Sequence, residues 1–372
     1  MNFAFSEEQE QLRGIVKRFL DERSPEGEVR RLMETEDGYD ADVWAQMADQ
    51  LGLQGLAIPE ELGGSGYGFL ELTVVMEEMG RRLPCLPFFS TAVLGTMTLL
   101  HAGDDALAKE HLPAIAAGDR LATLALLEEG GSWRPDDVAL SATTSGDGGW
   151  MLNGTKTHVI DGHVADLILV VGRTPAGVSL FAVEPGAEGV ERTALVPMDL
   201  TRKQATLTFR ATPAKLVGQE GAAAPVVDRV LQLAAVALAA EQVGGALECL
   251  EMSVAYAKQR IQFGRPIGSF QAVKHKCADM LVEVESARSA AYYAGWAAAT
   301  LDDDLPIAAA MAKAYCSDAF THCAAENIQI HGGIGFTWEH PAHLYFKRAK
   351  TSELLFGDPA AHRERLAELL GL

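Results

Sequence analysis

The hydrophobic period changes twice along the chain, and this order restricts the fold more than any other feature. Residues 6–118 have a helical pattern, residues 121–215 have short β-branched runs bounded by Gly, Pro, Asn and Asp, and residues 222–372 are helical again. A chain of 372 residues also exceeds what one hydrophobic core usually organises. We therefore expect a mostly α protein with an inserted β domain. Its parts are an N-terminal helical domain (1–120), a small antiparallel sheet or barrel (121–221) and a C-terminal four-helix bundle (222–372).

Local signals support this division. Ser6 can cap a first helix with its hydroxyl, and the acidic residues Glu7 and Glu8 in the first turn favour the same helix start. The segment 70–83 has a helical pattern and follows a glycine-rich loop at 59–68. Strands are expected at 150–160, 166–173, 178–185 and 205–211, and the dipeptide Asn153-Gly154 favours a hairpin turn.

Three long helices are expected in the last third of the chain, at 226–260, 270–299 and 305–333. The first half of 226–260 is apolar on nearly all sides. Such a helix is typical of the centre of a bundle or of an oligomer interface rather than of a surface.

Charge and cysteine content restrict the partners and the compartment. With 31 basic and 51 acidic residues, the net charge of −20 argues against general binding to nucleic acid or to anionic membranes. The N-terminus lacks the pattern of a signal peptide, and we expect no membrane span, since no uncharged apolar run reaches about 20 residues. The five cysteines include no CxxC pair and are expected to be buried thiols. These features favour a cytoplasmic protein.

The first motif that carries chemistry is RIQFGRPIGSFQ (260–271), at the junction of two long helices. Arg260 and Arg265 flank a glycine-containing bend, where guanidinium groups suit a pyrophosphate and Phe263 can pack on a ring. The alternative is a helix end at which cations face the negative end of the helix dipole before a turn.

The second motif is QIHGGIGF (329–336), which follows the third long helix. Its three glycines in four residues allow a ligand to approach the backbone, whose N–H groups can face an anion. The alternative is a plain turn that stops the helix. The motif does not follow a strand, so it is not a dinucleotide-binding fingerprint of the Rossmann type.

Together, these motifs resemble those of the acyl-CoA dehydrogenase family. The resemblance covers essentially the whole chain and includes F-S-E-E-Q at the N-terminus, P-E-x-x-G-G-x-G at 59–66 and L-N-G-x-K at 152–156. It implies FAD as cofactor, held between the β domain and the C-terminal helices. In the family, the R-x-x-F-G and Q-x-x-G-G segments reach the flavin of a neighbouring subunit. Carried over to this chain, that role falls to Arg260, Phe263, Gly264, Phe270, Gln271, Gln329, Gly332 and Gly333.

The chain departs from the family in the β domain, where most members have T-E-P-x-x-G-S-D and W-I-T-N beside the flavin. The first motif matches LEEGGSW (127–133), which lacks the hydroxyl residue and the proline. The second matches HVID (158–161), where Ile160 cannot donate the hydrogen bond of a threonine. His158 can stack on the flavin or donate to it, or it can be a solvent-facing or structural residue.

The larger departure concerns the catalytic base. The family reaction needs a carboxylate to remove the α-proton of the thioester. The usual glutamate falls at Phe356 here, and the glutamate that a minority of members use on a long helix falls near Ala234. Asp358 and Glu241 are the two substitutes. Glu241 lies seven residues, or about 10 Å, along the helix from Ala234. Alternatively, Asp358 caps the last helix, and Glu241 is a buried structural acid.

These observations leave three hypotheses open. The chain is a self-sufficient acyl-CoA dehydrogenase of fatty acid or sterol side-chain oxidation, which forms a 2-enoyl-CoA and passes electrons to an electron-transfer flavoprotein or a similar acceptor. Or it is a base-lacking subunit that lends flavin-binding residues to its neighbour in a hetero-oligomer. A dimer of dimers is expected in either case. The third is a flavin-free helical scaffold or binding protein. A flavin monooxygenase of the same fold also dispenses with the glutamate and stays open.

Overall fold

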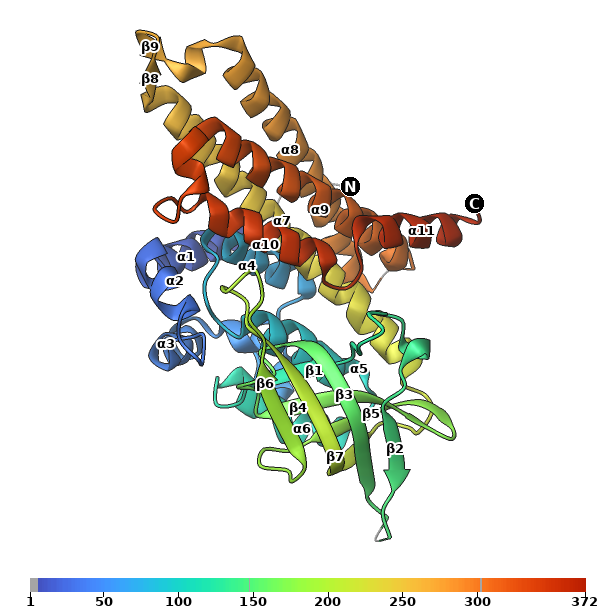
Figure 1. The fold of residues 1–372 in the computed structure, drawn as a ribbon. Coiled ribbons are helices and arrows are strands. Elements are labelled where there is room, and N and C mark those ends of the chain that lie inside the picture. The colour runs from blue at the N-terminus through green and yellow to red at the C-terminus, as the bar shows by residue number, and fades with distance from the viewer. Residues whose placement is uncertain (1–5, 147, 302) are drawn as a thin grey trace. The chain divides into compact units, whose positions relative to one another are not determined.

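The computed structural model describes residues 6–146, 148–301 and 303–372 and is drawn in Figure 1. The chain divides into two compact units. The first, which we call the helical unit, contains Met1–Arg31, Phe69–Pro84 and Ala235–Leu372. The second, the β unit, contains Leu32–Gly68 and Cys85–Ala234. The structure thus confirms a mostly helical protein with an inserted β domain, whereas the boundaries at 120 and 221 stay predictions.

The helical unit begins with the expected capping interaction. The Ser6 hydroxyl accepts a hydrogen bond from the Gln9 backbone N–H, and the Gln9 side chain accepts one from the Ser6 N–H. Phe5 of the F-S-E-E-Q motif lies outside the described residues. The helices of this unit are α1 (Glu7–Arg23), α2 (Glu26–Met33, which ends in the β unit), α4 (Phe69–Arg82), α8 (Gln271–Thr300), α9 (Leu305–His331), α10 (Ala342–Leu354) and α11 (Pro359–Leu370).

The longest helix, α7 (Ala224–Gln259), runs through both units. One 18-residue window of α7 is long and apolar enough to cross a membrane, but 83% of that window is buried within the protein. The core helix of a bundle has these properties. Four of the five cysteines are buried as expected, namely Cys85, Cys249, Cys316 and Cys323, whereas Cys277 of α8 is only half-buried.

Two glycines let α4 and α7 touch at the backbone. A Cβ atom added at Gly80 of α4 would lie 1.9 Å from the carbonyl oxygen of Glu241, and one added at Gly244 of α7 would lie 1.8 Å from that of Glu77. Only glycine is compatible with these separations, so the α4–α7 crossing depends on both residues.

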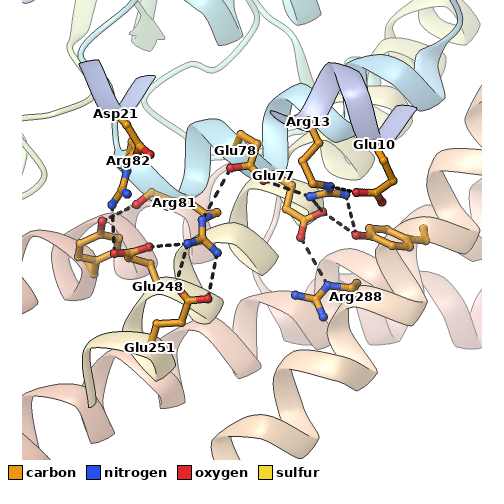
Figure 2. Close-up of polar contacts among 12 residues, drawn as sticks. Glu10, Arg13, Asp21, Glu77, Glu78, Arg81, Arg82, Glu248, Glu251 and Arg288 are labelled. Carbon is orange, nitrogen blue, oxygen red and sulfur yellow. Dashed lines mark hydrogen bonds and ion pairs between the residues drawn. The ribbon is translucent and has the colours of Figure 1, made fainter. Parts of the chain in front are cut away.

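A network of buried charges also fixes α4 within the helical unit (Figure 2). The Glu77 side chain is 1% exposed and contacts Arg13 of α1 at 3.0 Å and Arg288 of α8 at 3.4 Å. One turn later, Arg81 contacts Glu248 of α7 at 3.2 Å. Because buried charges require partners, these contacts restrict how α1, α7 and α8 can pack around α4.

The β unit holds a barrel-like sheet. In the described residues the pairings β4–β2, β2–β3, β3–β7, β7–β5 and β5–β4 form a closed ring, with β1 added beside β4 and β6 beside β7. Most pairs are antiparallel as expected, but β4 pairs in parallel with β1 and β2. The strands are β1 (Ala122–Ala125), β2 (Ser141–Thr144), β3 (Trp150–Ile160), β4 (Leu167–Thr174), β5 (Gly177–Val183), β6 (Val190–Ala194) and β7 (Gln204–Val217).

Side chains from the strands form the hydrophobic core of the β unit, which also contains short helices. Leu152, Ile168, Phe181 and Phe209 are among its buried core residues. The helices of the β unit are α3 (Ala41–Leu51), the π-helix η3 (Phe89–Gly95), α5 (Thr96–His101) and α6 (Asp105–Ala116).

The hairpin expected at Asn153-Gly154 is wrong. Both residues lie inside β3, at a register shift against β7, which is a β-bulge. Gly154 has a φ of 144°, and the Asn153 side chain accepts a hydrogen bond from the Ala211 N–H at 2.8 Å. The dipeptide therefore bends a long strand instead of reversing the chain, since its amide satisfies the backbone group that the bulge leaves unpaired.

Candidate functional site

The R-x-x-F-G segment forms a small hairpin at one end of the helical bundle (Figure 1). Strand β8 (Ile261–Gln262) pairs with β9 (Arg265–Pro266) across a two-residue turn. Both turn residues have positive φ, 55° at Phe263 and 75° at Gly264, as a type I′ turn requires. Glycine adopts this conformation freely, whereas a phenylalanine is strained in it.

Phe263 is presented to solvent by this strained turn. Its side chain is 91% exposed and meets Phe270 edge-on, at 6.0 Å between ring centroids. The Arg265 guanidinium lies over the ring of Phe270, 4.1 Å from its centroid. Arg260 and Gln271 are also exposed. A strained, exposed aromatic residue at a tight turn is a feature of surfaces that bind a ligand or a partner.

The Q-x-x-G-G segment has a similar character. Helix α9 ends at His331, and Gly332, with a φ of 65°, leads into the 3-10 turn η6 (Gly332–Phe336). A Cβ atom at Gly332 or Gly333 would have no neighbour within 4 Å, so this backbone is open to an incoming ligand. Phe336 is 84% exposed, and Gln329 is exposed as well.

The structure brings together the helix ends that carry these two segments. Tyr256, one turn before Arg260, packs on His331, two residues after Gln329, with 4.3 Å between ring centroids. The predicted nucleotide-contact residues of both motifs therefore belong to one end of the helical unit.

Two residues that match the family's contacts to a chain's own flavin are buried, in contrast to the exposed residues of the two motifs. Leu127 is 9% exposed and Ile160 is 3% exposed. Each uses its backbone within the β unit: the Leu127 carbonyl accepts from the Thr157 N–H, and the Ile160 carbonyl accepts from the Thr123 hydroxyl. His158 is exposed at a second bulge of β3 with a φ of 51°, and its Nδ1 lies 3.0 Å from the Thr157 hydroxyl.

A buried ion pair supports the segment that contains Leu127. The Lys156 ammonium contacts Glu128 at 2.7 Å and donates to the Leu126 carbonyl at 2.9 Å. Burial lowers the pKa of Lys156 to about 8, although Glu128 opposes this shift. Burial acts to raise the pKa of Glu128, but the contacts with Lys156 and two backbone N–H groups outweigh it, so that pKa is lowered. The L-N-G-x-K lysine is thus structural.

Phe356, where the resemblance places the family's usual glutamate, lies in a tight turn between α10 and α11. Phe356 has a φ of 61° and is 7% exposed, and its carbonyl accepts a hydrogen bond from His362 at 3.0 Å. Burial and the nearby Lys313 lower the pKa of His362 to about 4, which keeps that ring neutral. Asp358 is exposed and caps α11, accepting from the Ala361 N–H at 2.8 Å.

Lys313 of α9 holds this turn and was not singled out from the sequence. It is fully buried, and its ammonium donates to the carbonyls of Glu353 and Gly357 and to the Ser317 hydroxyl, at 3.0–3.1 Å. Burial lowers its pKa to about 8. A single lysine in the alanine-rich stretch 308–314 was the available signal, because a buried charge needs a specific set of partners.

The second substitute base, Glu241, is paired. Its carboxylate contacts Arg348 of α10 at 3.0 Å, and both side chains are almost fully buried. This is the structural alternative stated above for Glu241. Arg348, like Lys313, was not identified from the sequence.

Comparison with known proteins agrees with this architecture. The family model described as "Acyl-CoA dehydrogenase, N-terminal domain" matches residues 6–119, and the one described as "Acyl-CoA dehydrogenase, C-terminal domain" matches residues 224–371. The chain is 35% identical over 362 residues to acyl-CoA dehydrogenase IpdE2 of Mycolicibacterium smegmatis, covering 97% of this chain and 98% of that protein.

Two solved structures extend the comparison. A chain of the ChsE4-ChsE5 complex from Mycobacterium tuberculosis superposes with a TM-score of 0.91 at 32% identity, covering 100% of this chain and 99% of that one. A variant of the Tcur3481-Tcur3483 steroid ACAD gives a TM-score of 0.88 at 32% identity, covering 98% of each chain. The two family models match most of the chain and the relative covers nearly all of it, and this chain therefore belongs to the acyl-CoA dehydrogenase family of oxidoreductases.

Proposed function

We propose that this chain is an FAD-dependent acyl-CoA dehydrogenase subunit that lacks its own catalytic base and lends flavin-binding residues to an adjoining, related subunit. Membership of the family supports the reaction, the α,β-dehydrogenation of a CoA thioester to a 2-enoyl-CoA. The side chains of this chain support the division of labour between two subunits.

One observation carries the proposal. Three positions that serve a chain's own flavin and thioester in the family hold apolar side chains here: Leu127, Ile160 and Phe356. All three are buried within their own units. None of them can donate a hydrogen bond from its side chain or take up a proton. The supporting contacts remain, since Lys156 still holds Glu128 and Lys313 still holds the turn around Phe356.

The residues that serve a neighbour's flavin fit their expected ligand. The exposed guanidinium of Arg260 suits a pyrophosphate, and the open backbone at Gly332 and Gly333 leaves room for a nucleotide. Phe263 offers an exposed ring for packing. These groups face solvent in the isolated chain, as they must if their partner lies on another subunit.

In the proposed assembly, FAD supplies the acceptor for the β-hydride of the thioester. The role of this chain is to bind: Arg260 neutralises phosphate charge, Phe263 covers a ring, and the Gly332-Gly333 backbone lets the nucleotide approach closely because no side chain is in the way. The base that removes the α-proton comes from the adjoining subunit. We expect an electron-transfer flavoprotein or a similar protein to reoxidise the flavin.

Both substitute bases, Asp358 and Glu241, have a structural role in this chain. Asp358 caps α11, and Glu241 contacts Arg348 in the core of the helical unit. These contacts favour the base-lacking subunit over a self-sufficient homo-oligomer. The ChsE4-ChsE5 and Tcur3481-Tcur3483 structures each name two proteins, which supports a hetero-oligomer here. By the same analogy we propose a CoA thioester with a steroid or fatty acyl group as substrate.

The test is flavin content. The purified chain alone is expected to be colourless, and co-expression with a base-containing chain of the same family is expected to give a yellow, active complex. Arg260→Ala should lower the FAD content of that complex by about tenfold or more, because a charge-assisted phosphate contact is lost. Arg365→Ala, which removes an exposed arginine paired with Glu368 on α11, is the matched control. One FAD per chain in the chain alone, or unchanged flavin in the Arg260 variant, would contradict the proposal.

Asp358 permits a separate test of the base. Asp358→Asn keeps an oxygen that caps α11, so we expect stability and activity of the complex to stay unchanged. Asp358→Ala should lower the free energy of unfolding by about 1 kcal/mol, with activity at permissive temperature retained. The measurements are thermal melts and turnover. Loss of turnover in the Asn variant, with its melting temperature intact, would identify Asp358 as the base after all.

A further inference from the structure

Two histidines that pack against each other lie at the two ends of the glycine segment and close it into a loop. His331 ends α9, immediately before Gly332, and His340 lies shortly before α10. Their rings pack against each other at a tilt of 44°, with 4.2 Å between centroids, and the Tyr256 ring also contacts His331 at 4.3 Å. The loop 332–339 therefore begins and ends at the same place, where the rings of Tyr256, His331 and His340 pack together.

Hydrogen bonds assign a protonation state to each ring. The Nδ1 of His331 lies 2.8 Å from the Asn327 carbonyl, so this nitrogen carries a hydrogen. The Nδ1 of His340 accepts from the Ala342 N–H at 3.2 Å, so this nitrogen carries none. A second proton on His340 must bind at that Nδ1 and displace the Ala342 N–H. A second proton on His331 would place a charge against the His340 ring.

The surroundings also oppose protonation. The charged groups that face the loop histidines are Arg30 and Glu26 of α2 and Lys347 of α10, and Glu26 is already engaged by Arg30 at 2.7 Å. Burial lowers the pKa of His331 and of His340, and for His340 the charges of His331 and Arg30 add to the effect while Glu26 opposes it.

The far side of the loop is anchored in the same way. Trp338 packs edge-on against His343 at 4.6 Å, and the Lys347 ammonium lies over the Trp338 ring at 4.0 Å. Burial and Lys347 lower the pKa of His343 as well. A proton on His343 would therefore add a second cation beside Lys347 at the ring that holds the loop.

We propose that His331 and His340 are positioning residues for the segment 332–339 and that they hold it in place only while both rings are neutral. The role of the segment in binding a neighbour's flavin rests on the proposed function, but the closure of the loop does not. Protonation separates the two packed rings and frees the Gly332-Gly333 backbone, so acidification is expected to release the segment before the bundle unfolds.

Hydrogen–deuterium exchange on the full chain, without flavin, tests this directly. Peptides that cover 332–341 are compared at about pH 7.5 and about pH 5.5 after correction for intrinsic exchange rates. An opened histidine with an ordinary pKa near 6.5 binds its proton within this window. Each neutral histidine in the closed loop therefore predicts about a tenfold loss of protection. Peptides from the middle of α9 should keep theirs.

Two variants distinguish titration from simple structural support. His340→Asn keeps an acceptor for the Ala342 N–H but cannot be protonated at the ring, so the contribution of His340 to the pH dependence should disappear and only that of His331 should remain. His322→Asn removes an exposed histidine elsewhere on α9, one that pairs with Glu283 of α8, and the pH dependence should remain. Equal protection at both pH values in the unmodified chain, or an undiminished pH effect in His340→Asn, would overturn the inference. Since the readout requires no flavin, either result leaves the proposed function to its own test.

Discussion

Gly244→Ala is expected to lower the free energy of unfolding of this protein by about 3 kcal/mol, the upper end of the cost of overpacking. The added methyl group would lie 1.8 Å from the Glu77 carbonyl oxygen, which belongs to the backbone of α4 and cannot rotate away. Helices α4 and α7 must then separate, which strains the ion pairs of Arg81 with Glu248. Urea denaturation followed by circular dichroism measures the loss.

Gly14→Ala is the matched control. Gly14 also lies inside a helix, α1, but a Cβ atom there would have no neighbour within 4 Å. Because alanine favours a helix over glycine, this variant should be unchanged or more stable by up to about 1 kcal/mol. Similar urea midpoints for the Gly14 and Gly244 variants would show that α4 and α7 do not cross as closely as the structure has them.

Arg348→Met is expected to lower the free energy of unfolding by about 3–5 kcal/mol, because it leaves Glu241 buried without the guanidinium that it contacts. The pair is almost fully buried on both sides, with 3.0 Å between Arg348 Nη1 and Glu241 Oε1. The loss comes from the stranded carboxylate more than from the missing bond, since a buried charge costs more than a hydrogen bond supplies. Chemical denaturation again provides the measurement.

The double variant Arg348→Met with Glu241→Met separates the two contributions. Removing both charges also removes the uncompensated carboxylate, so most of the stability should return. Breaking the exposed pair of Arg365 and Glu368 with Arg365→Ala should change the stability by less than about 1 kcal/mol. A double variant as unstable as Arg348→Met alone would refute the assignment of Glu241 as a structural acid.

The sequence predicts elements well where one physical signal dominates. The long helices expected at 226–260, 270–299 and 305–333 are found as α7, α8 and α9, because sustained apolar periodicity has few other solutions. The expected strands at 150–160 and 166–173 are likewise β3 and β4. The Asn153-Gly154 prediction failed because a local turn preference competes with the pairing of a whole strand, and the pairing prevailed.

The residues of the candidate site also fall into those that local sequence motifs reveal and those that only tertiary contacts reveal. The two motifs around Arg260 and Gln329 could be read from the chain, since glycines and arginines at fixed spacing are local features. Lys313 and Arg348 could not, because their importance lies in burial and in partners far away in the sequence.

The order of helical and β segments and the apolar character of α7 were determined by the sequence alone, because each is a property of neighbouring residues. That Phe356 takes the position of the family's usual glutamate stays a prediction from the resemblance. Only the tertiary structure decided that Glu241 forms an ion pair with Arg348, that Asp358 caps a helix, and that His331 packs against His340. The physical reason is that burial and pairing depend on distances between segments. Side chains of the same kind therefore have different roles according to what the fold places beside them.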